Sequence, residues 1–480
     1  MTTDSSPPPH RHLSAQERRA IQMIPFIVGC ALFMQMLDST VVATALPVMA
    51  QALDTTPVKM NVSITSYLLA LAVFVPISGW AADRFGARRV FITAIGLFAL
   101  SSVACAFSQN LTQLVLARVV QGAAGAMMVP VGRVILLRIT PKDQLLKAMS
   151  FLSMPALLGP IIGPPLGGFL VTYASWHWIF LINVPVGLLG IAMVRRFIAH
   201  DIPQSPPRLD WLGFVLSGVA LACLVSGFEA LGRSDVTRLQ LTVLLGTGFA
   251  CGVLYVFHAL RATQPIIDLS LLRNQAFGVS VLGGNLCRLS VGATPFLLAI
   301  VLQVGFGMTP FAAGLITFTS AAGALIMKLI VTHVISRLGF KPILTYNALL
   351  TGGFVMLCAF FQADTPVWLM ILVLFLGGIF RSLQFTAVNT LTYADLAPSE
   401  MSRASSFAAM AQQLGISLGV GFAALIVNLS MSWRDADQMA PVDVKWAFLI
   451  IGAVTMLSWF SFSRLPDATA EHLRQTGKSH

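Results

Sequence analysis

The stretch FMQMLDSTVVATALP (residues 33–47) is an apolar run that contains a single carboxylate, Asp38. A soluble protein could turn such a side chain toward water, so the first question is whether this segment meets water at all. Of the 480 residues, 56% are hydrophobic and 10% are charged, whereas about 25% of the residues in ordinary globular domains are charged. This is the composition of a membrane protein, and the run therefore places an acid inside the membrane.

Apolar runs of about 20 residues, the length that spans a bilayer as a helix, recur along the whole chain. Because lipid offers no partner for unpaired backbone groups, such runs fold as helices. We predict an all-α integral membrane protein with about fourteen spans, at residues 22–47, 60–82, 89–108, 111–137, 148–173, 176–196, 210–230, 237–260, 275–303, 309–335, 341–362, 366–393, 402–428 and 443–463.

The chain has 30 Lys and Arg residues against 19 Asp and Glu residues. The cations lie between apolar runs and form no cluster, which favours membrane topology over nucleic-acid binding. If both termini are cytoplasmic, most loop cations are cytoplasmic too. The outer loops then hold only Lys59, Arg233, Arg238, Arg434 and Lys445. The positive-inside rule therefore predicts that both termini lie in the cytoplasm.

Two similar segments indicate a duplicated chain. ITPKDQLLKAMSF (139–151) and LAPSEMSRASSF (396–407) each follow a long span and precede a Gly-rich one. In repeats of this kind the substrate site lies between the halves near the middle of the membrane. We predict a cytoplasmic tail (1–21), a six-helix bundle (22–197), a linker with two extra spans (198–274), a second six-helix bundle (275–463) and a cytoplasmic tail (464–480).

Five motifs resemble those of a known family. GWAADRFGARR (79–89) resembles the signature loop of the major facilitator superfamily, and LVLARVVQG (114–122) resembles its fourth-helix motif. GPIIGPPLGG (159–168) is similar to the fifth-helix motif of antiporters. LDSTVVATALP (37–47) and QQLGISLGV (412–420) are similar to motifs of the EmrB/QacA-type branch, the fourteen-span drug:proton antiporters. The resemblance implies the major facilitator fold and proton-coupled multidrug efflux across a bacterial cytoplasmic (inner) membrane.

Two of these motifs carry the residues that the resemblance assigns to gating and conformational change. In the first motif, Gly79 permits close helix packing, Gly86 permits a tight turn and Asp83 lies beside several cations. In the fifth-helix motif, glycines allow close packing and prolines remove backbone donors. The predicted gating residues are Gly79, Asp83, Arg84, Gly86, Arg88, Gly159, Pro160, Gly163, Pro164, Gly167 and Gly168.

Asp38 is the only acid that falls well inside a predicted span. A charge at mid-bilayer costs about 2.5–3.5 kcal/mol on insertion scales, so such a residue is a functional-site hypothesis. The helical rise places Asp38 and Arg118 level within about one turn, where they can pair. Two interpretations are open: a permanent ion pair that holds helices together, or a carboxylate that exchanges its partner for a proton. Resemblance to proton-coupled antiporters favours the second, with Asp38 and Arg118 as the proton-coupling residues.

Helical spacing also brings polar residues into register along several spans. Arg288 and Arg381 lie deep in spans, with no acid of their own half at that depth to pair with, and are expected to face a cavity. Lys328 faces the same cavity or snorkels toward the cytoplasm, and Arg133 is expected to snorkel. For single Asn and Gln residues an interhelical hydrogen bond is the competing interpretation. The predicted substrate-cavity residues are Met34, Gln121, Asn285, Arg288, Arg381, Gln384 and Asn389.

The second half supplies Arg288, Lys328 and Arg381 at membrane depth without a deep Asp or Glu. A buried cation needs an opposite charge. The sequence therefore predicts a cavity that favours anionic, zwitterionic or neutral amphipaths over dications.

A membrane-embedded enzyme is a competing class, and it would need a nucleophile, a base or metal ligands at one depth. The eight His residues fall in loops or near span ends, and the six Cys residues are scattered singly without CxxC spacing. We therefore predict a transporter without cofactor or metal. Its predicted partners are a small amphipathic substrate, protons and membrane lipids, with no nucleic acid. We expect a monomer, and membership of an efflux assembly stays open, as does export of one specific lipid, peptide or metabolite.

Overall fold

The structure, a computed structural model, describes residues 15–55, 60, 62–141, 144–199, 208–231, 236–308, 310–435 and 439–466. Within these ranges every regular element is a helix. Thirteen helical segments of the described residues are long and apolar enough to cross a membrane. The 29-residue helix α7 (Leu145–Tyr173) is a further long helix. The prediction of an all-α membrane protein with about fourteen spans is confirmed.

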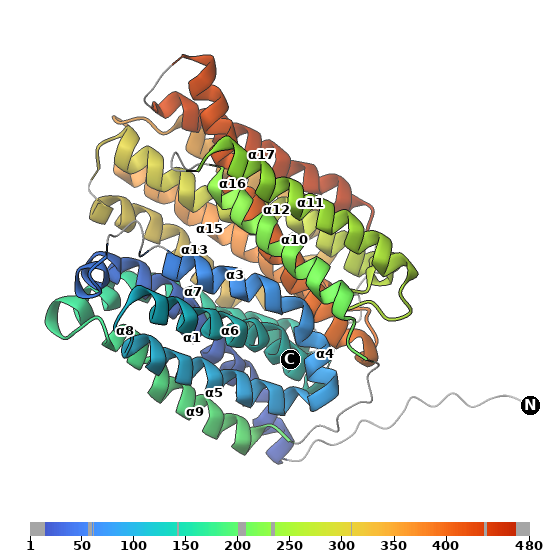
Figure 1. Cartoon of the computed structure of the whole chain (residues 1–480). Helices are drawn as coiled ribbons and strands as arrows, with labels where there is room; N and C mark the ends of the chain where they lie inside the picture. The colour runs from blue at the N-terminus through green and yellow to red at the C-terminus, as the bar shows by residue number, and fades with distance from the viewer. Residues whose placement is uncertain are drawn as a thin grey trace, which may run out of the picture.

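The first half of the chain forms one bundle, drawn in blue to teal in Figure 1. Within it α1 packs along α7, and α6 packs against both α3 and α5. Its elements are α1 (Ala15–Ala52), α3 (Val62–Phe74), η1 (Val75–Ile77), α4 (Ser78–Phe85), α5 (Ala87–Ala106), α6 (Leu111–Ile139), α7, α8 (Trp178–Leu181) and α9 (Asn183–Phe197).

Prolines explain where two expected spans are interrupted. The span expected at 60–82 contains the 3₁₀ turn η1, which includes Pro76. The span expected at 176–196 divides into α8 and α9, and Pro185 lies in the first turn of α9. Proline has no backbone N–H to continue the helical ladder, so each break falls where a helical hydrogen bond is missing.

The second half forms a bundle of its own, from yellow to red in Figure 1. Its elements are η3 (Leu269–Arg273), α12 (Gln275–Ile300), η4 (Val301–Gly305), α13 (Pro310–Leu338), α14 (Phe340–Leu357), η5 (Cys358–Phe360), α15 (Val367–Leu391), η6 (Pro398–Glu400), α16 (Met401–Trp433) and α17 (Pro441–Ser463).

Two extra helices, α10 (Trp211–Ala230) and α11 (Arg238–Arg261), separate the halves in sequence. Helix α10 packs on α3 of the first half and on α16 of the second. Helix α11 lies outside α10, and its large apolar side chains Leu239, Phe249 and Leu260 are at least 70% exposed. A row of exposed apolar side chains is unfavourable in water, so this surface is suited to lipid.

Glycines set how closely the helices approach. A Cβ on Gly122 of α6 would lie 2.4 Å from the carbonyl oxygen of Tyr67 on α3, and one on Gly419 of α16 would lie 2.1 Å from that of Leu289 on α12. Such contacts require a residue without a side chain, as is typical of membrane helix interfaces. Each half is therefore tightly packed within itself.

The halves meet at the end of the molecule that carries Arg84, Arg138, Arg195 and Arg403, which we call the basic end. There the Ser78 and Ser406 hydroxyls lie 2.8 Å apart. Farther from this end, Ser405 Oγ donates to the carbonyl oxygen of Pro130 at 2.9 Å, and Ser150 Oγ donates to that of Lys328 at 3.0 Å. These three contacts each join one half to the other, so the basic end is closed.

Candidate functional site

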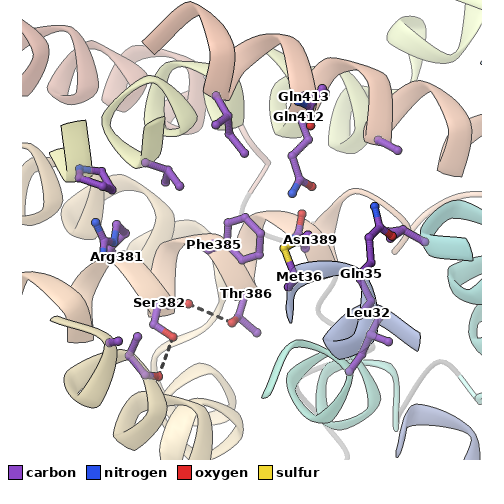
Figure 2. A pocket seen from close by; sticks show the side chains of 18 of the residues that line it. Leu32, Gln35, Met36, Arg381, Ser382, Phe385, Thr386, Asn389, Gln412 and Gln413 are labelled. Atoms are coloured by element: carbon purple, nitrogen blue, oxygen red, sulfur yellow. Dashed lines mark hydrogen bonds between the residues drawn. The ribbon is translucent and has the colours of Figure 1, made fainter. Parts of the chain in front are cut away.

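A cavity of about 1050 Å³ lies between the two halves. Helices α1, α3, α6 and α7 supply one wall, and α12, α13, α15 and α16 supply the other. Figure 2 shows Leu32 and Met36 of α1 together with Phe385 of α15 among its lining side chains. Most lining residues are apolar, which suits a ligand with an apolar body.

Three cations line this cavity: Arg133 of α6, Lys328 of α13 and Arg381 of α15. Among the described residues that line it there is no Asp or Glu. Each cation donates to a neutral side chain: Arg133 to Gln412 at 3.4 Å, Lys328 to Thr386, and Arg381 to Ser320 at 2.8 Å. The cavity therefore carries positive charge without an acid of its own.

Arg288 lies behind this wall rather than in the main cavity. Its Nη1 donates to Asn285 Oδ1 at 3.1 Å, and its Nη2 donates to Asn389 Oδ1 at 3.0 Å. Asn389 lines the main cavity, and a small side cavity touches both Arg288 and Arg381. Of the predicted cavity residues, Arg381 and Asn389 thus line the cavity, whereas Asn285 and Arg288 stand one layer back.

Two other predicted cavity residues do not line the main cavity, although Gln384 lines the small side cavity. Gln384 donates to the carbonyl oxygen of Leu344 at 3.2 Å and accepts from Asn347 at 2.9 Å, so it fixes α15 to α14. This is the interhelical hydrogen bond that the competing interpretation expects of a single Gln. Met34 is 1% exposed and belongs to the hydrophobic core. Met36, which the sequence analysis did not single out, lines the cavity in its place.

The expectation that Arg133 snorkels toward the cytoplasm is wrong for this conformation. The side chain is 8% exposed and turns into the cavity. Because α16 covers the basic end, the guanidinium meets an amide, that of Gln412, instead of water. Figure 2 shows Gln412 and Gln413 projecting from α16 beside the cavity. Lys328 also lines the cavity, which is the first of the two positions expected for it, the other being a side chain that snorkels toward the cytoplasm.

A buried polar cluster lies in the first half, and we call it the Asp38 cluster. Arg118 Nη1 donates to Asp38 Oδ2 at 2.5 Å. Gln121 and Asn183 donate to Asp38 Oδ1 at 3.0 and 3.1 Å. Both amides also donate to Ser102 Oγ, at 2.7 and 3.2 Å. All five side chains are fully buried, and they come from α1, α5, α6 and α9.

Gln121 belongs to the Asp38 cluster and is not among the described residues that line the cavity, where it was predicted. Arg118 also donates through Nε to the carbonyl oxygen of Ser63, and its guanidinium lies 4.2 Å from the centre of the Tyr67 ring. Its Nη2 has no hydrogen-bond partner among the described residues. In the described part of the chain no three His, Cys, Asp or Glu side chains gather into a metal site. The Asp38 carboxylate is thus surrounded by side-chain hydrogen-bond donors, those of Arg118, Gln121 and Asn183.

One layer of side chains separates the Asp38 cluster from the cavity. Gln35, three residues before Asp38 on α1, lines the cavity. Gly125 lines it as well, and the Tyr67 hydroxyl would lie 3.2 Å from a Cβ on that glycine. Because Gln35 and Tyr67 are themselves buried, Asp38 is close to the cavity but not exposed to it.

The predicted gating residues of the first motif lie at the basic end. Asp83 accepts from Arg138 at 2.8 Å and from Ser402 at 2.6 Å, and Arg138 donates to Ser402 at 3.0 Å. We call these three residues the Asp83 latch, since Ser402 belongs to the second half. A Cβ on Gly79 would lie 2.6 Å from the Ser402 carbonyl oxygen, so this glycine allows α4 to touch α16.

The rest of this motif shapes the turn between α4 and α5. Gly86 has a φ of 86°, in the region that favours glycine. Arg88 is buried and donates to the carbonyl oxygen of Arg195 at 3.0 Å, which ties α5 to α9. Arg84 is exposed at the end of α4.

The fifth-helix motif lies in α7, where it packs on α1. A Cβ on Gly159 would lie 2.6 Å from Met36 Cβ, and one on Gly163 would lie 2.0 Å from Thr40 Oγ1. Gly167 is buried, whereas a Cβ on Gly168 would meet nothing within 4 Å. The side chains of Pro160 and Pro164 lie outside the described residues. The two glycines of this motif thus bring α7 against the part of α1 that carries Asp38.

Comparison with known proteins identifies the family to which this architecture belongs. The profile of the Major Facilitator Superfamily matches residues 28–284 and 280–480. The chain is 38% identical over 452 residues to MdtD of Escherichia coli O6:H1, a protein named for multidrug resistance, and the match covers 93% of this chain and 95% of that protein. It is 39% identical to MdtD of Escherichia coli O157:H7 with the same coverage.

Two solved structures share the fold at low sequence identity. The human organic anion transporter MFSD10 superposes with a TM-score of 0.64 at 16% identity, covering 95% of this chain and all (100%) of that one. The proton:xylose symporter XylE superposes with a TM-score of 0.64 at 14% identity, covering 96% and 99%. The chain therefore belongs to the major facilitator superfamily and is a multi-pass membrane transporter, as its motifs predicted.

Proposed function

We propose that this transporter is a proton-coupled antiporter that exports drugs and other amphipathic compounds, with its basic end and both termini in the cytoplasm of a bacterial cell. The observation that carries the proposal is the position of Asp38. This carboxylate is fully buried, is paired with Arg118 and lies one layer from a large apolar cavity. A buried acid that can lose its partner is the simplest device for coupling a proton to a change of packing.

The Asp38 cluster suits both protonation states of the carboxyl group. The ionised form accepts from Arg118, Gln121 and Asn183. The protonated form has an O–H to donate, and the Gln121 amide oxygen, which now accepts from Arg118 Nη1 at 2.6 Å, is an acceptor in the same cluster. Proton uptake also removes the charge that holds Arg118, whose Nη2 is already free to take another acceptor. Protonation would therefore loosen α1 from α6.

Helix α1 connects the Asp38 cluster to the cavity. It carries Asp38 and also presents Leu32, Gln35 and Met36 to the cavity. A shift of α1 on protonation would thus change the cavity wall directly. The closed basic end supports a cycle in which the described conformation releases substrate on the other side, since the cavity extends from Arg133 near the basic end to Gly314 near the start of α13.

Two alternatives give different results in experiments. A permanent Asp38–Arg118 pair would hold helices together without titrating. A transporter of one specific lipid, peptide or metabolite would move a single class of compound. The names of the MdtD relatives favour drugs, and a substrate panel distinguishes the two. We further propose a monomer, with protons and membrane lipids as its other partners.

The test replaces Asp38 with Asn, which keeps the shape of the side chain but cannot titrate. We expect Asp38→Asn to abolish proton-driven uptake of substrate into inside-out vesicles while substrate binding to the purified protein persists. The matched control is Asp54→Asn, since Asp54 is exposed just after the end of α1. Undiminished proton-driven uptake by Asp38→Asn would remove this residue from the mechanism.

A further inference from the structure

We propose that the cavity selects organic anions with an apolar body over organic cations of the same size. The inference rests on the proposed export function and names its substrate class. It is carried by Arg133, Lys328 and Arg381, the cations that line the cavity, and by the absence of any Asp or Glu from its described lining.

The three cations lie at similar distances from the basic end, measured along their helices. Lys328 and Arg381 each stand ten residues before the end of their helix, α13 and α15. At 1.5 Å per residue each is about 15 Å from the basic end. Arg133, six residues before the end of α6, is about 9 Å from it. The positive charge thus occupies the inner part of the cavity, where a bound ligand is best shielded from water.

The partners of these cations leave the charge uncompensated. Gln412, Thr386 and Ser320 are neutral, so none of these partners supplies the opposite charge that a cation away from water needs. A ligand carboxylate would form charge-assisted hydrogen bonds, which are about twice as strong as neutral ones. A ligand ammonium group would meet like charges and lose its hydration, so the same cavity disfavours it.

Behind the cavity wall, the Asp38 carboxylate of the described residues is already occupied by other donors. Asp38 lies three residues after the cavity-lining Gln35 on α1, and it already accepts from Arg118, Gln121 and Asn183. Gln35 stands between Asp38 and the cavity. A cation could reach this acid only after the Asp38 cluster had opened, whereas an anion meets its partners on the cavity wall.

The remaining lining defines the rest of the ligand. Phe318, Phe385 and Met36 are among the apolar side chains around the three cations, and aromatic and thioether groups accept varied apolar shapes. Arg133 belongs to the first half, whereas Lys328 and Arg381 belong to the second. An anionic head group between them would draw the two halves together, while its apolar body occupies the wider part of the cavity.

The test uses three probes that share a pyrenebutyl body and differ in the head group: the carboxylate, its methyl ester and the trimethylammonium analogue. Binding to the purified protein in nanodiscs is measured by energy transfer from tryptophan to pyrene, with empty nanodiscs as the blank. We expect the carboxylate to bind at least about tenfold more tightly than the ammonium probe, since a hydrogen bond to a charged group contributes roughly 1.5–3 kcal/mol. This comparison needs only the natural protein.

Variants then locate the charge. Arg381→Gln and Lys328→Gln should each weaken carboxylate binding by about tenfold and leave ester binding unchanged. Arg381→Lys should retain most of the preference because it keeps the charge. The matched control is Arg261→Gln, which removes an exposed cation at the end of α11 and should change none of the three affinities.

Ammonium binding as tight as carboxylate binding, or an equal loss for ester and carboxylate in the variants, would overturn the proposal. Proton-driven uptake of the same probes into inside-out vesicles separates it from the proposed function. A carboxylate preference without proton-driven uptake would refute the antiport and leave the charge preference standing. Proton-driven uptake of the ester and ammonium probes without a carboxylate preference would refute the charge preference and leave the antiport standing.

Discussion

Asp38 persists in an apolar helix because other helices supply every partner that it needs. Arg118 of α6 provides the opposite charge, and amides from α6 and α9 provide further donors. Burying a charge is costly unless it is both paired and hydrogen-bonded. The pair is thus strongly interdependent: either residue alone would be an uncompensated charge in a fully buried site.

This interdependence predicts how the two residues affect stability. Arg118→Met should lower the free energy of unfolding by about 3–5 kcal/mol, the usual cost of removing one partner of a buried pair. The double variant Asp38→Leu, Arg118→Met should regain most of that stability, since no charge remains. Thermal unfolding of the purified protein in detergent measures both, and neither variant should transport. A single variant as stable as the natural protein would show that the pair is not held as described.

Single residues were only partly predictable from the sequence. The helical rise indicated that Asp38 and Arg118 lie level, because depth follows from residue count. Asn183 and Ser102 gave no comparable signal, since a lone Asn or Ser in a span can bond to any neighbouring helix. The prediction that Arg133 snorkels toward the cytoplasm was wrong for a related reason. Its distance from the helix end suggested snorkelling, and only the packing of α16 against the basic end shows that water is not the nearest partner.

At the level of helices, contact between α7 and α1 depends on the positions of individual glycines. Gly163 faces Thr40, and a methyl group there would overlap its hydroxyl; Gly168, five residues on, faces open space. Helix α1 also carries Asp38, so the spacing of these two helices bears on the Asp38 cluster.

The two glycines give a matched pair of substitutions. Gly163→Ala should destabilise the protein by about 1–3 kcal/mol, the usual cost of overpacking, and should lower the transport rate. Gly168→Ala, in the same motif, should leave both unchanged. Melting temperature and proton-driven uptake check the pair, and Thr40→Ala should partly restore Gly163→Ala because it removes the atom that clashes. Equal behaviour of the two alanine variants would contradict the close approach at Gly163.

The helices themselves were well predicted, and the reason is physical. Lipid forces each apolar run of span length to satisfy its own backbone, so hydropathy alone finds the spans. The breaks at η1 and between α8 and α9 fall near Pro76 and Pro185. Hydropathy did not predict these breaks, because it does not depend on whether a residue has a backbone N–H. The sequence did not predict which helices pack together, because helix packing depends on close contacts such as that between Gly122 and Tyr67.

Across the whole molecule, the two halves touch toward the basic end through both polar and apolar side chains. The Asp83 latch joins α4 and α6 of the first half to Ser402 of the second. Helix α10 contacts both halves: Gly218 packs on Val73 of α3, and Phe228 packs on Gly421 of α16. The hydrogen bonds between the halves border an apolar contact, since one buried apolar cluster includes Met149 and Leu152 of α7 together with Met327 and Val331 of α13.

The Asp83 latch should set the balance between closed and open basic ends. Asp83→Asn removes the charge that Arg138 pairs with while keeping a hydrogen-bonding group. We expect the population with separated basic ends to rise about two- to fivefold, which corresponds to a loss of roughly 0.5–1 kcal/mol for a partly exposed ion pair. Spin labels at Arg89 of the first half and Ser399 of the second, both exposed, report the separation by pulsed electron resonance.

Asp268→Asn is the control for this measurement. It breaks the ion pair between Asp268 and Arg403 at the same end of the molecule, but both residues belong to the linker and second half, so the distance between the labels should not change. If both variants separate the labels equally, loss of charge at the basic end would be sufficient and the Asp83 latch would have no special role. If only Asp83→Asn does so, the ion pair at the contact between the halves sets the equilibrium between closed and open basic ends.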